Sequence, residues 1–150
     1  MPAAGRSEGT KLNPVQRFVE AINRSDIDGA ASAFHPDFEM IVPQHPSRNF
    51  HGRDQEVKNM RHLTTTYPEG RIELKRMVET PSEIWIESIF TAQDLQVAAV
   101  VIYEVDRETD TIRSGRYYSE RVESLGPGID EWIQGFHDDP AVTRNRTAGR

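Results

Sequence analysis

Two tyrosines and two histidines are the side chains best suited to chemistry on a small molecule. Tyr103 and Tyr117 lie in segments with the composition of strands, and His45 and His51 flank a polar, proline-containing segment. A phenol can donate a proton and an imidazole can accept one, so the tyrosines are candidate acids and the histidines candidate bases. No carboxylate accompanies them at a position expected to face inward, which favours binding over catalysis. A purely structural role for the phenols, at the rim of a sheet, is the alternative.

The five histidines do not predict a metal site. No two of them stand four residues apart on one predicted helix, and none has a carboxylate at a spacing typical of metal ligands. The chain contains no cysteine, which excludes disulfides, thiolate nucleophiles and cysteine-bound metals. We therefore expect neither a metal nor another cofactor.

The length and charge of the chain limit its partners. With 150 residues it fits a single domain, and 24 acidic against 18 basic side chains give a net charge of -6, which does not favour nucleic acid. No apolar run approaches the roughly 18 residues of a membrane span, so we expect no membrane partner and a soluble, cytoplasmic protein. Residues 1–12 and 138–150 have the composition of disordered tails, which leaves residues 13–137 as the domain.

Apolar residues recur twice at helical spacing near the start of the chain. Asn13 followed by Pro14 is a favourable helix start, and Gln16 is placed to complete a capping box. A second helix should begin at Ile27 and end before Pro36, because proline cannot supply the next backbone donor. The apolar stripes are Val15, Phe18, Val19 and Ile22 in the first helix and Ile27, Ala30, Ala31 and Phe34 in the second.

A strand and a third helix follow, and the rest of the chain has the character of a sheet. Residues 38–42 predict a short strand, residues 44–49 a loop, and residues 50–54 lead into a helix with Val57 and Met60 facing inward. Further strands are predicted at residues 72–80, 84–92, 96–106 and 111–122, with a C-terminal helix at residues 128–137. Because helices and strands do not alternate, we expect an α+β fold with the helices on one face of a mostly antiparallel sheet.

The strand at residues 98–103 is apolar at every position, so both of its faces should be covered. The helices cover one face. A second copy of the chain is the simplest cover for the other, which predicts a homodimer through the outer face of the sheet. The residues expected in this interface are Trp85, Glu87, Ile89, Ala98, Val100, Ile102 and Tyr118.

Four features taken together resemble the nuclear transport factor 2-like superfamily. They are the helical hairpin, the corner at residues 34–38, the segment at residues 50–53 and the closing strand at residues 112–120. The similarity is greatest to the SnoaL-like and ketosteroid-isomerase-like branch and extends over residues 15–122. The resemblance implies a cystatin-like cone, in which a curved sheet wraps around a helix and leaves an apolar pocket at the open end. It also implies pairing of subunits through the outer face.

The catalytic residues of this superfamily do not carry over. Ketosteroid isomerases resemble this chain but place a tyrosine and two acids where Phe18, Val42 and Val101 stand, and none of these can move a proton. SnoaL-like cyclases place an acid near the position of Tyr117. The positions that match the charged and assisting residues of limonene-type epoxide hydrolases are Phe90, Ser88, Tyr117, Val42 and Gln44. The resemblance therefore disfavours ketosteroid isomerase and epoxide hydrolase activity.

Three functions remain open. The first is binding of a small apolar molecule, such as one that contains a ring, in the cone. The second is a SnoaL-like cyclase, isomerase or dehydratase for a polyketide- or steroid-like substrate, with the tyrosines as acid and the histidines as base. The third is a structural or protein-binding module with a filled cone. The predicted pocket residues are Phe18, Ile22, Phe34, Phe38, Met40, Val42, Gln44, Met60, Ile86, Ser88, Phe90, Val101, Tyr103, Tyr117 and Ser119.

Overall fold

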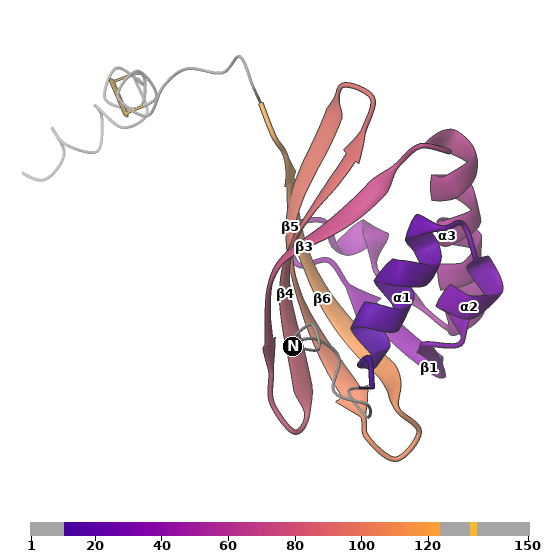
Figure 1. The fold of residues 1–150 in the computed structure, drawn as a ribbon. Coiled ribbons are helices and arrows are strands. Elements are labelled where there is room, and N and C mark those ends of the chain that lie inside the picture. The colour runs from indigo at the N-terminus through magenta and orange to yellow at the C-terminus, as the bar shows by residue number, and fades with distance from the viewer. Residues whose placement is uncertain (1–10, 124–132, 135–150) are drawn as a thin grey trace, which may run out of the picture.

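A single curved sheet of six strands carries three α-helices on one of its faces (Figure 1). The computed structural model describes residues 11–123 and 133–134. The elements are α1 (Pro14–Asn23), α2 (Ile27–Ala31), β1 (Phe34–Ile41), the 3-10 helix η1 (Pro46–Arg48), β2 (Phe50–His51), α3 (Arg53–Thr66), β3 (Arg71–Glu79), β4 (Glu83–Ala92), β5 (Leu95–Asp106) and β6 (Thr111–Arg121). This arrangement confirms the predicted α+β fold.

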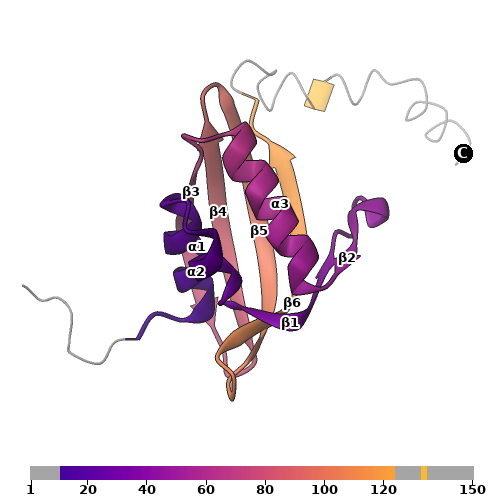
Figure 2. The same cartoon turned by 90° about the vertical axis from the view of Figure 1, so that its right-hand side faces the viewer.

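The strand order in the sheet is β2-β1-β6-β5-β4-β3. Neighbouring strands are antiparallel except for β1 and β6, which run parallel. Figure 2, turned so that the helices face the viewer, shows α3 running lengthwise over the sheet, with α1 and α2 beside it. The helices and the sheet therefore enclose an interior between them.

The start of α1 agrees with the capping pattern in the sequence. The side chain of Asn13 accepts a hydrogen bond from the backbone N–H of Gln16 at 2.9 Å, and the side-chain oxygen of Gln16 accepts one from the N–H of Asn13 at 2.9 Å. Pro14 occupies the first turn, where its missing N–H costs nothing. The capping box thus fixes where α1 begins and which of its faces meets the sheet.

The predicted end of the second helix was wrong. α2 ends at Ala31, and Phe34 and Pro36 already belong to β1. Pro36 is tolerated there because the pairing of β1 with β6 is irregular between Phe34 and Glu39, so no ladder hydrogen bond is required from its nitrogen. The corner expected at residues 34–38 is therefore the irregular first half of a strand.

Aromatic rings fill the interior beneath α1 and α2. The ring centroids of Phe18 and Phe34 are 5.0 Å apart, and those of Phe34 and Phe38 are 4.8 Å apart, both pairs meeting edge to face. Phe34, Phe38 and Ile112 are almost fully buried. Such contacts add to the free energy gained from burial, so this part of the interior is a solid core.

Two predictions concern regions that are only partly described. The predicted C-terminal helix lies outside the described residues except for Ile133 and Gln134, which are helical. The predicted N-terminal tail is described only at Lys11 and Leu12, and Lys11 forms an ion pair with Asp110 at 3.2 Å. In the described part of the chain, no helix has the length and apolar character required to span a membrane.

Candidate functional site

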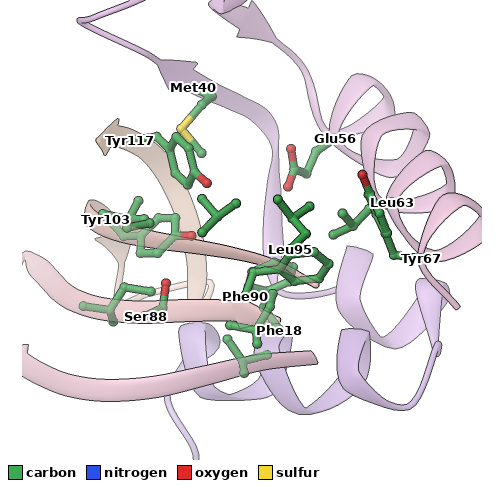
Figure 3. A pocket seen from close by; sticks show the side chains of 16 residues that line it. Phe18, Met40, Glu56, Leu63, Tyr67, Ser88, Phe90, Leu95, Tyr103 and Tyr117 are labelled. Carbon is green, nitrogen blue, oxygen red and sulfur yellow. The ribbon is translucent and has the colours of Figure 1, made fainter. Parts of the chain in front are cut away.

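A cavity of about 300 Å³ lies between the sheet and helices α1 and α3. Figure 3 shows its sixteen lining side chains, which come from both layers of the fold. Most of them are apolar, and the carboxyl or hydroxyl oxygens come from Glu56, Tyr67, Ser88, Tyr103 and Tyr117. The remaining lining residues are Phe18, Val19, Met40, Leu63, Ile72, Ile86, Phe90, Leu95, Val97, Ala99 and Val101.

Alternation along β4 and β5 determines which of their side chains line the cavity. Ser88 lies opposite Ala99, and Ile86 lies opposite Val101, in the antiparallel pairing of β4 with β5. Residues two apart on a strand share a face, so these pairs form adjacent rows that point toward the helices. Tyr103 continues the row on β5.

A glycine on the neighbouring strand leaves room for the ring of Tyr103. Tyr103 pairs with Gly115 of β6, and a Cβ atom at Gly115 would lie 3.3 Å from the Tyr103 ring and 3.1 Å from the sulfur of Met40. Glycine therefore leaves room for both side chains. Burial, and to a smaller extent the charges of Glu56 and Tyr117, raise the pKa of Tyr103, so its phenol stays protonated and acts as a hydrogen-bond donor.

Glu56 is the titratable group that sequence reasoning missed. It lies near the start of α3, is partly buried and lines the cavity. Burial raises the pKa of its carboxyl group to about 7, and a hydrogen bond with Asn59 partly opposes that rise. The carboxyl group therefore gains or loses a proton near neutral pH. The expectation that no carboxylate accompanies the tyrosines was wrong.

A second chamber, more open to solvent than the first, adjoins the cavity. Its volume is about 400 Å³, and it shares Met40, Glu56 and Tyr117 with the first. The shared residues place the carboxyl group of Glu56 and the ring of Tyr117 at the boundary between the two chambers. The other residues that line the second chamber are Val42, Arg48, Phe50 and Asn59. Arginine and asparagine make it the more polar of the two.

The predicted pocket residues fall into three groups. Those that line the cavity are Phe18, Met40, Ile86, Ser88, Phe90, Val101, Tyr103 and Tyr117, and Val42 lines the second chamber. Those that belong to the solid core instead are Ile22, Phe34, Phe38 and Met60. Gln44 and Ser119 line an outer hollow with Glu87, Val100 and Tyr118, and this hollow shares Ala99 with the cavity. The core group was misplaced because these side chains pack into one buried cluster and fill space that the sequence was expected to leave open.

The two candidate bases do not meet the tyrosines. His45 and His51 are exposed, and neither lines either chamber. His51 is paired with Glu39 at the edge of the sheet. Among the described residues, no three histidine, aspartate or glutamate side chains gather closely enough to hold a metal ion.

Comparisons with known proteins agree with this architecture. The family model described as the SnoaL-like domain matches residues 15–114. No curated protein matches the chain in sequence.

Solved structures share the fold at low sequence identity. A ketosteroid isomerase candidate from Kribbella flavida DSM 17836 is 16% identical, with a TM-score of 0.63 over 77% of this chain and 81% of that one. A SnoaL-like polyketide cyclase candidate from Shewanella denitrificans OS-217 is 9% identical, with a TM-score of 0.62 over 71% and 88%. A protein of unknown function with a cystatin-like fold from Methylobium petroleophilum PM1 is 19% identical, with a TM-score of 0.64 over 77% and 78%.

Proposed function

The chain belongs to the SnoaL-like domain family, and on this premise we propose that it binds a small apolar, ring-containing molecule in the cavity between the sheet and α3. The cavity itself is the observation that carries the proposal. Its volume of about 300 Å³ is at the lower end of the range typical of small-molecule sites. The presence of this cavity is an argument against the alternative of a cone filled by its own side chains.

The lining suits a ligand that is apolar with one or two oxygen atoms. Phe18, Phe90 and Val101 offer apolar contact. The hydroxyl groups of Tyr103 and Tyr117 project into the same space, as Figure 3 shows, and can orient a carbonyl or hydroxyl group. Burial of the ligand ring would supply most of the binding free energy, and the hydroxyl groups would set its orientation.

Filling the cavity is the direct test. We expect the neutral fluorescent probe N-phenyl-1-naphthylamine to bind the wild type, and Ala99→Met to weaken that binding by at least about tenfold, because the longer side chain occupies the space beside Ser88 and Val101. Fluorescence titration measures the affinity.

Ala98→Met is the matched control for this test, because Ala98 lines the outer hollow but not the cavity, whereas Ala99 lines both. Binding that is lost in Ala98→Met, with or without a loss in Ala99→Met, would contradict the proposal and place the probe in the outer hollow. A wild type that binds no probe would contradict it as well.

An enzyme of the SnoaL-like type is the second candidate function. It would be a cyclase, isomerase or dehydratase acting on a polyketide- or steroid-like substrate, in keeping with the names of two proteins that share the fold. Glu56 favours this candidate, because it supplies the cavity with a carboxyl group that titrates near neutral pH. The role of base then passes from His45 and His51 to Glu56, with the tyrosines as hydrogen-bond donors.

We also propose that a second copy of the chain covers the outer face of the sheet. Trp85 is 44% exposed and Val100 is 43% exposed, and they lie on adjacent strands that face away from the helices. Ile89, Ala98, Ile102 and Tyr118 surround them in the register of β4, β5 and β6. An apolar area of this kind is typical of subunit contacts.

Sedimentation tests the dimer. We expect the wild type at micromolar concentration to sediment at twice 17.1 kDa, and Val100→Glu to sediment as the monomer, because a charge in an apolar interface opposes association. Val100→Glu should keep its affinity for the naphthylamine probe, since Val100 does not line the cavity. A monomeric wild type would contradict this part of the proposal.

A further inference from the structure

We propose that the second chamber is an anion subsite and that Arg48 is the residue that binds the anion. The ligand is an apolar ring that bears a carboxylate or a similar oxyanion, with the ring in the cavity and the anionic group against Arg48. This inference rests on the proposed function, since the ring must occupy the cavity, and it adds the charge of the ligand.

Arg48 supplies a positive charge to a site that is otherwise without one. Among the described residues that line the cavity, the second chamber or the outer hollow, no other lysine, arginine or histidine is present. The whole chain carries a net charge of -6, and Glu87 and Glu120 line the outer hollow. An anion is therefore attracted to the second chamber and repelled by the outer hollow.

A short loop that is tied to β1 brings Arg48 to the second chamber. The backbone N–H of Arg48, at the end of η1, donates a hydrogen bond to the carbonyl oxygen of His45 at 2.9 Å. The side-chain oxygen of Asn49 accepts one from the backbone N–H of Val42 at 2.7 Å. Because Val42 lines the chamber together with Arg48, this hydrogen bond holds the loop beside the chamber wall.

The guanidinium group of Arg48 is available to a ligand. Among the described residues, its side chain has no partner in an ion pair or a hydrogen bond, although Glu56 lines the same chamber. The side chain of Arg17, by contrast, binds the carboxylate of Asp110 at 2.6 Å and its backbone carbonyl oxygen at 2.7 Å. A planar guanidinium group without such partners can bind a carboxylate through two parallel hydrogen bonds.

The protonation of Glu56 controls the net charge that an anion meets. Burial raises the pKa of Glu56 to about 7, so below that pH its carboxyl group is mostly neutral and leaves the charge of Arg48 uncompensated. Above that pH the carboxylate repels an anion. The other titratable groups that line the two chambers are the phenols of Tyr67, Tyr103 and Tyr117. Affinity for an anionic ligand should therefore fall as the pH rises through 7.

The two chambers match the two parts of such a ligand. Figure 3 shows the carboxyl group of Glu56 and the ring of Tyr117 projecting toward each other from opposite layers, and both residues line both chambers. A ring in the apolar cavity can therefore carry a substituent past them into the second chamber. Because that chamber is the more open to solvent, the anionic group keeps part of its hydration, which lowers the cost of removing it from water.

A matched pair of fluorescent probes tests the subsite. 8-Anilinonaphthalene-1-sulfonate is N-phenyl-1-naphthylamine with one added sulfonate group. We expect the wild type to bind both probes at pH 6. Arg48→Gln should lower the affinity for the sulfonate probe about tenfold more than the affinity for the neutral probe, since it removes charged hydrogen bonds that only the sulfonate accepts. Fluorescence titration measures all four affinities.

The pH dependence is a second readout. From pH 6 to pH 8 the wild type should lose about tenfold in affinity for the sulfonate probe, which is the fall in the protonated fraction of a group with a pKa of about 7. Glu56→Gln should lack this loss, because glutamine stays neutral. The neutral probe should show no comparable loss in the wild type.

Arg61→Gln is the matched control, because Arg61 is exposed on α3 and lines neither chamber. It should bind the sulfonate probe as the wild type does. Three results would each overturn the inference and leave the proposed function intact: a wild type that binds only the neutral probe, an equal loss of both probes in Arg48→Gln, or an equal loss of the sulfonate probe in Arg61→Gln. A wild type that does not bind the neutral probe would overturn the proposed function, and this inference with it.

Discussion

The two ends of the interior are built from the same strands and differ in what covers them. At one end of β4 and β5, Ile84 and Val105 belong to the buried core that also contains Phe34 and Ile112. At the other end of the same strands, Phe90 and Leu95 line a cavity beside α3. Alternation along a strand determines which side chains face the interior. Whether the interior beside them is filled depends on how the helices pack over the sheet.

Matched phenylalanine truncations at the two ends should give the largest difference. Phe34→Ala removes a ring that is 1% exposed and packs against two other rings, so we expect a loss of about 4 kcal/mol in the free energy of unfolding. Phe90→Ala, whose ring is only partly buried beside existing empty space, should cost about 1 kcal/mol. Urea unfolding measures both. Equal losses would show that the cavity end is packed as tightly as the core.

Glu56→Gln should show how much the buried carboxyl group of Glu56 lowers the free energy of unfolding. The pKa of Glu56 is raised to about 7 in the folded chain, above its ordinary value of 4.5. The folded chain therefore holds a proton that the unfolded chain releases between these values, and wild-type stability falls as pH rises from 4.5 to 7. We expect Glu56→Gln to lack this fall and to be about 2 kcal/mol more stable than the wild type at pH 8.

Thermal or urea unfolding at pH 4 and pH 8 checks this prediction, and the two proteins should be nearly equal at pH 4. Glu39→Gln, which changes an exposed carboxylate, should follow the wild type at both values. A wild type whose stability does not fall over this range would place the Glu56 carboxyl group in contact with water.

Asn13→Ala should have the smallest effect on the free energy of unfolding. It tests how much the helix cap at the start of α1 stabilises the fold. The substitution removes the side-chain acceptor for the N–H of Gln16, and we expect a loss of about 1 kcal/mol. Asn13→Asp keeps an acceptor and should lose less. A loss of several kcal/mol for Asn13→Ala would show that its other contact, with the sulfur of Met77, matters more than the cap.

Local patterns predicted much of the fold because each depends on nearby residues. Asn13 and Gln16 marked the start of α1, and strand alternation brought Ile86, Ser88 and Phe90 to one face. The end of the second helix was predicted wrongly from Pro36. The irregular pairing that accommodates Pro36 in a strand involves β6, which is far away in the sequence.

The cavity could be predicted only in part. Phe34 and Phe90 are the same residue type and face the same interior. The rings of Phe18 and Phe38 pack against Phe34 and make it core, whereas Phe90 borders the cavity. Glu56 did leave a signal in the sequence. It precedes Met60 by four residues and Leu63 by seven, so it shares their face of α3, and a glutamate on an inward stripe marks a buried carboxyl group.

The parallel pairing of β1 with β6 has a consequence for how the chain folds as it is synthesised. β6 is the last strand of the sheet to leave the ribosome, and Ile112, the partner of Phe34, is made long after it. Until then, Phe34 and Phe38 lack the strand that flanks them in the native sheet. Closure of the sheet is a late, non-local event, so the nascent chain exposes the rings of Phe34 and Phe38 until β6 has been made and is prone to aggregate over that interval.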